Sequence, residues 1–453
     1  MKINAIVLAA GRGTRMKSNI PKVIHKILEK PMIMHVIDNL KEAQVGEIIS
    51  IIGYKAEMVK EIIDGNSKYA YQIDQLGTGH AIMMAEEHLS GQEGVTIVIC
   101  GDTPLISSET ISELIDHHIK SENTATILTG VLDDALAYGR IIRDEENKVT
   151  SIVEYKDATD KERQIKEFNT GTYIFDNEKL FELINLVGND NAQREYYLTD
   201  IISIMYKQGY KVDGCILNEL EETIGINDRK TLAYAQSILQ EKINNELMDA
   251  GVTITDPKTT YIGPDVKVGV DTIIHPNTYL YGETNIGENC IVGPDTEIVD
   301  STILDNSSII YAHIHDCTIK SNVKVGPYAR LRQNCIIEDD VRIGNFVEMK
   351  KSLFGEGSKS AHLSYIGDAI IGSNVNIGCG AITVNYDGLK KYQTIVEDDV
   401  FIGCNANLIA PVKIEANAVI AAGTTVTSDV PSESLVIGRV RQEIKNDFTS
   451  KFK

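Results

Sequence analysis

The spacing of hydrophobic positions changes twice along the chain and divides the sequence into three parts. In residues 1–226, short apolar runs such as Ile3–Ala9 and Val95–Ile99 alternate with stretches of helical periodicity such as Ile33–Ala43 and Thr110–Ile119. Further segments of these two kinds are Ile48–Ile52, Thr126–Val131 and Glu178–Ile184. Strands that alternate with helices predict an α/β domain with a mostly parallel sheet covered on both faces. The ligand site of such a sheet lies at the carboxyl ends of its strands.

Residues 227–250 have the pattern of one long helix. Apolar residues recur there at steps of three and four, which predicts an apolar stripe along one face. The stripe consists of Leu232, Ala235, Leu239, Ile243 and Leu247. We expect this helix to link two bodies.

From residue 251 to residue 453 the apolar period becomes six. A first run holds Ile262, Val268, Ile274, Leu280, Ile286, Val292, Ile298, Leu304 and Ile310; a second holds Ile319, Val325, Leu331, Ile337, Ile343 and Met349; a third holds Val396, Ile402, Leu408, Ile414, Ile420 and Val426. Neither a helix nor an alternating strand keeps this period. It is typical of a parallel β-helix built from hexapeptide repeats, in which stacked aliphatic side chains point inward. The sequence therefore predicts a β-helix domain with a short C-terminal tail.

Two segments, Lys351–Leu363 and Asn385–Thr394, interrupt the period. We expect both to protrude as loops. An otherwise regular solenoid tends to carry its chemistry on such interruptions.

Composition narrows the classes of partner and the compartment. Among 453 residues, Lys and Arg total 44 and Asp and Glu total 65, a net charge of −21. Such a chain is not expected to bind nucleic acid or an anionic membrane, although local cations can still bind anionic substrates. Its apolar runs are far shorter than the ~20 residues that span a bilayer, and no signal peptide is expected. Seven scattered cysteines without a C-x-x-C pair favour a reducing cytoplasm over a disulfide framework or zinc site.

A glycine-rich segment follows the first strand. Gly11 and Gly13 would let backbone N–H groups approach phosphate oxygens, and Arg15 and Lys22 could neutralise phosphate charge. The segment is neither a P-loop nor a complete dinucleotide fingerprint. Taken alone, it is equally compatible with a tight turn between a strand and a helix.

The whole string L-x-x-G-x-G-T-x-M, followed by Pro21-Lys22, resembles the sugar-nucleotide pyrophosphorylases. Other segments of the first part fit the same resemblance: Gln72, Leu76–Ala81, Cys100–Leu105, Gly139–Ile141, Val153-Glu154, Asn169–Gly171 and Gly225–Asn227. Together with the β-helix, the chain resembles the bacterial bifunctional enzymes with N-acetylglucosamine-1-phosphate uridylyltransferase and glucosamine-1-phosphate N-acetyltransferase activities. The resemblance runs from Ile3 to Arg439. It implies a Rossmann-like nucleotidyltransferase domain and a left-handed β-helix.

For uridylyl transfer, the resemblance implies that Asp102 and Asn227 bind Mg²⁺ and that Lys22 and Arg15 act on the phosphates of UTP. The implied contacts to UTP and the UDP-sugar are Leu8, Ala9, Ala10, Gly11, Gly13, Lys22, Gln72, Gly77, Thr78, Gly139, Glu154, Asn169 and Asn227. Such a displacement needs positioning and charge neutralisation more than covalent help. Viewed singly, Asp102 reads as a turn former at a strand end, and Asn227 as a helix N-cap.

For acetyl transfer, Gly357–Asp368 resembles the acetyltransferase loop of the family, with His362 as the general base. Histidine titrates in the range needed to keep an attacking amine neutral. The implied contacts to glucosamine phosphate are Arg332, Lys350, Tyr365 and Asn376, and those to acetyl-CoA are Cys379, Asn385, Tyr386, Cys404, Ala422 and Arg439. The segment that begins with Asn385 and Tyr386 resembles a contact to the sugar as well as to acetyl-CoA. The alternative is that His362 lies on an ordinary surface loop and that Arg332 and Lys350 are solvated.

Cys379 and Cys404 depart from the family, which carries Ala and Ser at these positions. A thiol at position 404 makes a weaker hydrogen bond than the hydroxyl it replaces. We hypothesise that the two cysteines make acetyl transfer sensitive to thiol reagents.

The resemblance further implies a homotrimer that supplies UDP-N-acetylglucosamine for the cell envelope from glucosamine 1-phosphate, acetyl-CoA and UTP, with N-acetylglucosamine 1-phosphate as intermediate. One alternative is a nucleotidyltransferase for another sugar whose β-helix serves only assembly or regulation. His362 and Arg332 count against it, because an assembly module needs neither a base nor a phosphate contact. Another alternative is a non-catalytic nucleotide-sugar sensor. Intact Lys22, Asp102 and Asn227 count against that one.

Overall fold

The computed structural model describes residues 1–135 and 137–452, so Lys453, the end of the predicted second domain, lies outside the described part. The chain separates into two compact units, Met1–Leu239 and Gln240–Lys453. The division falls inside helix α8 (Arg229–Asp249). Within the described residues, none of the helices combines the length and the apolar composition needed to cross a bilayer.

The first unit is built on a mostly parallel sheet in the order β11-β7-β10-β6-β1-β4-β5, with β8 and β9 beside β10. Strand β1 pairs in parallel with β4 and β6, whereas β10 runs antiparallel to β6 and β7. The strands are β1 (Ile3–Ala9), β4 (Glu47–Ile52), β5 (Lys68–Tyr71), β6 (Val95–Cys100), β7 (Ala125–Val131), β8 (Arg140–Arg143), β9 (Val149–Val153), β10 (Glu167–Asp176) and β11 (Val212–Ile216), with a separate hairpin of β2 (Lys26–Ile27) and β3 (Lys30–Pro31).

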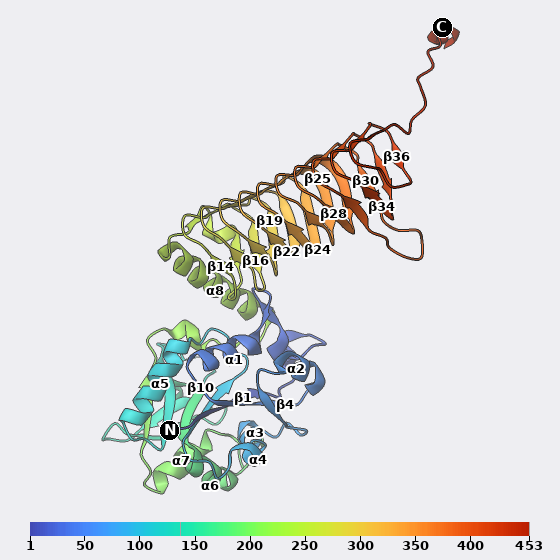
Figure 1. The fold of residues 1–453 in the computed structure, drawn as a ribbon. Coiled ribbons are helices and arrows are strands. Elements are labelled where there is room, and N and C mark those ends of the chain that lie inside the picture. Colours follow the sequence, from blue (N-terminus) through green and yellow to red (C-terminus); the bar gives the residue numbers. More distant parts are fainter. Residues whose placement is uncertain (136, 453) are drawn as a thin grey trace. The chain divides into compact units, whose positions relative to one another are not determined.

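Helices cover both faces of this sheet, as the sequence predicts (Figure 1). Successive side chains of a strand point to opposite faces, so Ile6 packs in one hydrophobic cluster while Ala5 and Val7 pack in the other. The helices are α1 (Met32–Glu42), α2 (Ala56–Ile63), α3 (Thr78–Met83), α4 (Glu86–Leu89), α5 (Ser108–Lys120), α6 (Asn177–Leu183) and α7 (Asp200–Lys207), with short 3₁₀ turns η1 (Thr14–Met16), η2 (Lys22–Ile24), η3 (Glu162–Gln164), η4 (Ile184–Leu186) and η5 (Leu220–Thr223). Residues of α1, α2 and α5 line one cluster, and residues of α3, α6 and α7 line the other.

The second unit is a left-handed parallel β-helix (Figure 1). Its stacked parallel coils confirm the prediction from the six-residue period, and the left hand is the one that the resemblance implies. Each coil stacks on the next in parallel register, so Ile262 pairs with Leu280, and Leu280 pairs with Ile298. The strands are β12 (Thr253–Ile254), β13 (Thr260–Ile262), β14 (Lys267–Val268), β15 (Ile273–Ile274), β16 (Thr278–Tyr281), β17 (Asn285–Ile286), β18 (Ile291–Val292), β19 (Thr296–Val299), β20 (Thr302–Ile303), β21 (Ser308–Ile309), β22 (Ala312–Ile319), β23 (Lys324–Val325), β24 (Ala329–Ile337), β25 (Arg342–Lys350), β26 (Leu353–Phe354), β27 (Lys359–Gly367), β28 (Ala369–Ile371), β29 (Asn376–Ile377), β30 (Ile382–Val384), β31 (Thr394–Val396), β32 (Phe401–Ile402), β33 (Asn407–Ile409), β34 (Val412–Ile414), β35 (Val419–Ile420), β36 (Thr425–Val426) and β37 (Leu435–Val436), with η6 (Pro257–Thr259) near the start and η7 (Phe448–Phe452) in the tail.

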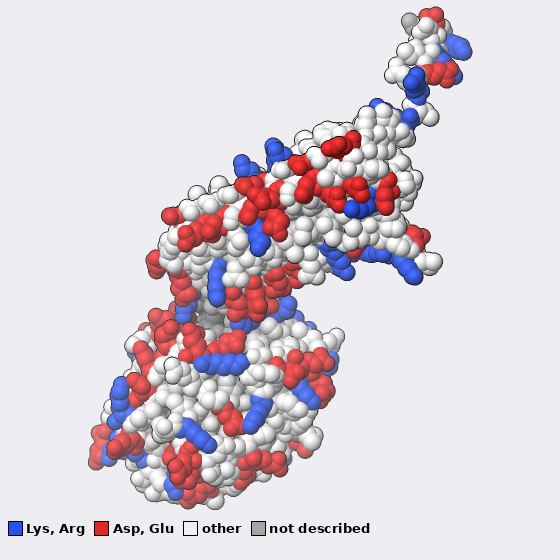
Figure 2. Space-filling view, viewed as in Figure 1, with Lys and Arg blue, Asp and Glu red and all other residues white. Residues whose placement is uncertain are grey.

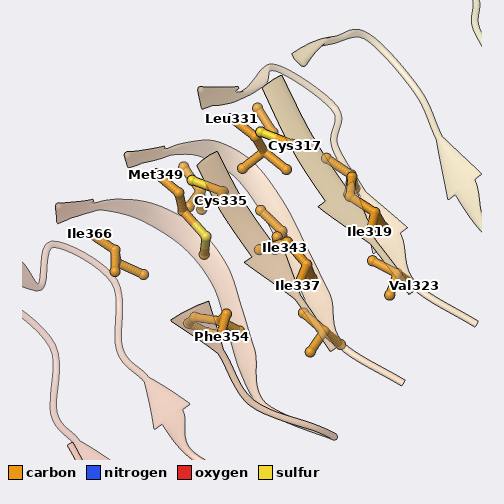
Figure 3. Close-up of a cluster of buried hydrophobic side chains, with 14 of the residues drawn as sticks. Cys317, Ile319, Val323, Leu331, Cys335, Ile337, Ile343, Met349, Phe354 and Ile366 are labelled. Carbon is orange, nitrogen blue, oxygen red and sulfur yellow. The ribbon is translucent and has the colours of Figure 1, made fainter. Parts of the chain in front are cut away.

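Two of the predicted inward positions, Leu304 and Ile310, are wrong. The inward side chains are Ile303 and Ile309, both fully buried, whereas Leu304 is 36% exposed. The physical reason is a shorter coil, because Ile286 pairs with Ile303 across 17 positions where a regular coil has 18. All six predicted positions of the second run are buried, and Figure 3 shows five of them, Ile319, Leu331, Ile337, Ile343 and Met349, together with Cys317, Val323, Cys335, Phe354 and Ile366.

The two predicted interruptions differ. Lys351–Leu363 does not protrude: it contributes β26 and part of β27, and Phe354 is fully buried in the core. The coil there is one residue shorter than a regular coil, since Ile337 pairs with Phe354 across 17 positions, and this shift made the segment look like an interruption of the period. Asn385–Thr394 does protrude, because Ile371 pairs with Val396 across 25 positions. Figure 2 shows basic side chains gathered where this loop leaves the β-helix.

The second half of α8 covers the first coil with amides as well as apolar side chains. Gln240 Nε2 donates to the carbonyl oxygens of Pro257 and Thr260 at 2.9 and 2.8 Å, and Asn244 Nδ2 donates to the same two oxygens at 2.9 and 3.1 Å. Ile243 of the predicted stripe packs against the β-helix core. The helix thereby supplies hydrogen bonds that a further coil would otherwise supply to this end of the solenoid.

Candidate active sites

The glycine-rich loop after β1 brings Lys22 close to the backbone. Gly13 adopts φ 63°, in the left-handed region, and a Cβ built there would lie 2.6 Å from Lys22 Cβ. Lys22 begins η2, whose next residue, Val23, is buried. Gly13 is therefore the residue whose missing side chain lets Lys22 pack over the loop.

Lys22 joins the carboxyl end of β6 to the segment before α8. Its Nζ forms an ion pair with Asp102 and donates to Asn227 Oδ1 at 3.1 Å. Arg15 Nη2 donates to the same Asn227 oxygen at 2.8 Å. The Ile226 N–H donates to the Asp102 carbonyl oxygen at 2.9 Å, which fixes Asn227 beside Asp102. The structure thus brings the two predicted metal ligands and the two predicted phosphate-binding cations together.

The oxygen atoms of Asp102 and Asn227 fit the role of Mg²⁺ ligands. Both approach one cationic group, the Lys22 ammonium, and both are the hard oxygen donors that Mg²⁺ prefers. Among the described residues there is no cluster of three or more His, Cys, Asp or Glu side chains that could hold a metal ion. A site with two protein ligands would leave the remaining coordination positions to phosphate oxygens and water.

Asn227 is not the N-cap of helix α8, which was the simpler interpretation of this residue. Asp228 caps α8, since its Oδ1 accepts the N–H groups of Lys230 and Thr231 at 3.0 and 2.8 Å. These hydrogen bonds lower the pKa of Asp228. Asn227 Oδ1 is therefore left for Lys22 and Arg15, while its Nδ2 donates to the Gly225 carbonyl oxygen at 3.1 Å.

A pocket at the carboxyl ends of the parallel strands holds many of the predicted nucleotide contacts. Predicted residues that line it are Leu8, Ala9, Ala10, Gly11, Lys22, Gln72, Gly77, Thr78 and Asp102. Of the other lining residues, Ala81 and Cys100 lie in segments covered by the resemblance but without a role of their own, and the sequence analysis missed Val23, Gln75 and Glu195. Burial, followed by the charge of Asp102, raises the pKa of the Cys100 thiol to about 12.

Gln72 and Gly77 are fixed to each other at one side of this pocket. Gln72 is buried and donates from Nε2 to the Gly77 carbonyl oxygen at 3.0 Å, while the same nitrogen lies 3.1 Å from His80 Nδ1. A Cβ at Gly77 would lie 2.6 Å from the Tyr196 carbonyl oxygen, so only glycine allows the two backbones to approach this closely.

The predicted sugar contacts Gly139, Glu154 and Asn169 also lie together. The Asn169 N–H donates to the Gly139 carbonyl oxygen at 2.9 Å, and Glu154 Oε2 lies 3.5 Å from where a Gly139 Cβ would be. Burial raises the pKa of Glu154, although its hydrogen bond from Thr199 Oγ1 opposes the shift. Thr199 and Tyr173, whose hydroxyl accepts from Asn169 Nδ2 at 2.7 Å, were missed because isolated polar residues give no sequence signal.

On the β-helix, the structure brings three of the four predicted glucosamine-phosphate contacts onto one outer face. Arg332 of β24 pairs with Lys350 of β25, and Tyr365 of β27 pairs with Glu348 beside them. Arg332 donates from Nε and Nη2 to Glu348 Oε1 at 3.0 and 2.6 Å. Lys391, from the protruding loop, was missed by the sequence; its ammonium lies beside Lys350 and lowers the pKa of Lys350, with Arg332 adding to the effect.

Asn376 lies elsewhere. It is the outward residue of β29, which stacks between β27 at Lys359 and β32 at Phe401. The coil turns a corner between this face and the face that carries Lys350. Within one chain, Asn376 is therefore not brought together with the other three predicted contacts.

His362 occupies a corner of the β-helix within β27, not a protruding loop as the sequence suggested. Its Nδ1 lies 3.3 Å from Asn345 Oδ1 on the preceding coil. On later coils the same corner carries predicted acetyl-CoA contacts. The coil of Cys379 is joined to the next one by a hydrogen bond from the Asn405 N–H to the Cys379 carbonyl oxygen at 2.8 Å. At the far end, Arg439 Nη1 donates to the Ala422 carbonyl oxygen at 2.9 Å. Cys404 lies between Cys379 and Ala422 in this stack, and both cysteines are exposed. The other two predicted acetyl-CoA contacts, Asn385 and Tyr386, lie at the base of the loop.

Comparison with known proteins agrees with both units. Residues 4–221 match the nucleotidyl transferase family, and residues 316–351 and 393–428 match the bacterial transferase hexapeptide repeats. Full-length relatives named bifunctional protein GlmU occur in Exiguobacterium sp. AT1b (51% identity over 447 residues, 99% of each chain), in Geobacillus sp. WCH70 (51% over 451 residues, 100% of this chain and 98% of the relative) and in Listeria welshimeri (48% over 447 residues, 99% and 98%). At this identity over nearly the whole length of both proteins, a nucleotidyltransferase unit and a hexapeptide-repeat unit occur in one chain in the same order, and the chain therefore belongs to the family of the bifunctional protein GlmU.

Proposed function

We propose that the chain makes UDP-N-acetylglucosamine in two steps, acetyl transfer from acetyl-CoA to glucosamine 1-phosphate followed by uridylyl transfer from UTP. The observation that carries the proposal is the convergence of Lys22, Asp102 and Asn227 in the first unit, while the second unit separately gathers cations around Lys350. A sensor or an assembly module has no need of either arrangement.

In uridylyl transfer, a phosphate oxygen of N-acetylglucosamine 1-phosphate attacks the α-phosphorus of UTP, and the bond to the β-phosphate breaks to release pyrophosphate. Lys22 and Arg15 neutralise charge on the phosphates, and the backbone around Gly11 and Gly13 holds the nucleotide. Asp102 and Asn227 would hold Mg²⁺, which would supply further charge neutralisation at the phosphates. Lys22 must then leave these two oxygens and bind phosphate.

In acetyl transfer, the amine of glucosamine 1-phosphate attacks the thioester carbon, the amine loses a proton to His362, and the coenzyme A sulfur leaves. Asn345 Oδ1 can accept only from a protonated Nδ1, which leaves the lone pair on His362 Nε2 to take that proton. Arg332, Lys350 and Lys391 bind the phosphate of the sugar.

We also propose that the active form is a homotrimer formed through the β-helix. Asn376 and the face around Lys350 are separated within one chain, so a second copy is needed if all four glucosamine-phosphate contacts serve one site. A cytoplasmic location is supported by the cysteines, all seven of which are free thiols.

The test is a mass-spectrometric assay with Mg²⁺, UTP, acetyl-CoA and glucosamine 1-phosphate, run beside single omissions. Wild-type protein should give UDP-N-acetylglucosamine only when acetyl-CoA is present. The His362→Ala variant should make none unless N-acetylglucosamine 1-phosphate is supplied. His313→Ala is the matched control, because His313 is an exposed histidine of the same β-helix on β22, and this variant should behave as wild type. Product that does not require acetyl-CoA would contradict the two-step function.

A further inference from the structure

The protruding loop Asn385–Thr394 is tied at both ends to Asp368. Asn385 Nδ2 donates to Asp368 Oδ2 at 2.5 Å, and the Thr394 N–H donates to the Asp368 carbonyl oxygen at 3.2 Å. The Asp368 N–H in turn donates to the Lys350 carbonyl oxygen at 2.9 Å. One residue therefore connects the loop to the coil that carries the sugar-phosphate contacts.

The carboxylate of Asp368 decides which way the Asn385 amide faces. An ionised carboxylate accepts hydrogen bonds and cannot donate them, so it must face the amide nitrogen. The Tyr365 hydroxyl lies 3.5 Å from that same nitrogen. Asn385 Oδ1 accepts no hydrogen bond from any residue that the structure describes, which leaves this oxygen for an N–H group of a ligand.

Two cations of the site, Lys350 and Lys391, lie close enough to Asp368 to interact with its charge. The pKa of Lys350 is lowered, chiefly by its contact with Lys391, and the negative charge of Asp368, which acts on both ammonium groups, opposes this shift. A molecule that carries both a phosphate and an amine would therefore find cations and a fixed hydrogen-bond acceptor side by side.

We propose that Asp368 is a positioning residue for acetyl transfer: its carboxylate holds the Asn385 amide so that Oδ1 accepts an N–H of the bound amino sugar and orients the amine for attack. The inference rests on the acetyl transfer proposed above. It adds a residue that touches neither substrate and acts through Asn385.

The proposal predicts a specific kinetic signature for Asp368→Asn. Asp368 adopts φ 49°, a left-handed conformation that asparagine tolerates, so the corner should keep its backbone. An amide at position 368 can either donate or accept, and Asn385 is then free to turn over. Loss of a charge-assisted hydrogen bond should lower kcat for acetyl transfer by about 10- to 100-fold. The KM for glucosamine 1-phosphate should stay the same or fall, because a negative charge beside Lys350 and Lys391 is removed. A merely unfolded loop would raise KM instead, because Lys391 would be lost from the site.

The experiment measures kcat and KM for both reactions in the full chain, with Asp340→Asn as matched control. Asp340 is also a corner aspartate, with φ 59°, and its N–H likewise donates to the preceding coil, to the Ser321 carbonyl oxygen at 3.1 Å. Support requires a lower kcat in Asp368→Asn alone, unchanged uridylyl transfer, and no additional loss when Asp368→Asn is combined with Asn385→Ala. Acetyl transfer like that of Asp340→Asn, or a raised KM with unchanged kcat, would overturn the inference while leaving the proposed function intact. A wild-type chain without acetyl transfer would overturn both.

Discussion

Gly13→Ala is the substitution that most directly tests how the first unit positions Lys22. A Cβ at this position would lie 2.6 Å from Lys22 Cβ, whereas ordinary contacts begin at about 3.4 Å. Lys22 must therefore move by about 1 Å, and it cannot do so by turning only the tip of its side chain, because the contact is at Cβ. The expected consequence is a displaced ammonium, which weakens its contacts to Asp102 and Asn227 and to the phosphates they face.

The size of the effect follows from two separable terms. Alanine at φ 63° carries backbone strain on the order of 1–3 kcal/mol, which lowers stability. Misplacement of a catalytic group by about 1 Å costs about 100-fold in rate. Gly91→Ala isolates the first term, because Gly91 has φ 73° and a Cβ there would meet nothing within 4 Å. Both variants should lose stability through backbone strain, Gly13→Ala more because of its contact with Lys22, and only Gly13→Ala should lose about 100-fold in uridylyl transfer.

The assay follows pyrophosphate release from UTP and N-acetylglucosamine 1-phosphate for both variants, with thermal unfolding measured beside it. Acetyl transfer by the same preparations serves as an internal control, since Gly13 lies in the other unit and this activity should be unchanged. Uridylyl transfer by Gly13→Ala within three-fold of Gly91→Ala would refute the reasoning that close packing of Lys22 on this glycine positions the ammonium.

Three further predictions concern metal, thiols and the core. Chelation with EDTA should abolish uridylyl transfer and leave acetyl transfer unchanged; equal loss of both would contradict the metal assignment. Alkylation at pH 8 should block acetyl transfer through exposed Cys379 and Cys404, with protection by acetyl-CoA, and should spare uridylyl transfer, because the Cys100 thiol with a pKa of about 12 stays protonated at that pH. Phe354→Ala should lower the free energy of unfolding of the β-helix by about 3–5 kcal/mol in urea titrations followed by circular dichroism, whereas Leu389→Ala, at a position 89% exposed, should change it by less than about 0.5 kcal/mol.

Periodicity predicted the β-helix well and its local irregularities poorly. Inward side chains must stack for the coils to exclude water, so most six-residue positions, such as Leu331 and Met349, are buried as expected. The coil that ends at Ile303 is one residue shorter than a regular coil, however. Leu304 is also aliphatic and stands at the regular spacing, so it was predicted to point inward in place of Ile303. The loss of one corner residue cannot be recognised from the sequence, because many different polar residues can occupy a corner. The same short coil length concealed Phe354 inside an apparent interruption.

Sequence motifs identified several residues that the structure brings together. They did not identify residues whose contacts become visible only in the structure. Lys22 and Asn227 are about 200 positions apart, yet family resemblance paired them, and the structure places them 3.1 Å apart. Lys391 could not be found in this way, and Asp368 ended a recognised segment without being given a role. Their roles arise from the distance between charges on a loop and on a coil, and a linear sequence does not contain that distance.

The position of the insertion explains how the second unit can carry a loop without interrupting the corner that holds the predicted acetyl-CoA contacts. Cys379 and Cys404 are 25 positions apart, whereas Cys404 and Ala422 are separated by the regular 18. The strands that lead into these three residues, β29, β32 and β35, nevertheless stack in register. The extra residues leave the coil at the other end of the intervening strand, at Asn385, so the stack that leads from His362 is continuous. A loop inserted at the first corner would have broken that stack. The solenoid thus separates two features: one corner keeps a continuous row of the predicted acetyl-CoA contacts, and the next corner carries the loop that brings Lys391 beside Lys350.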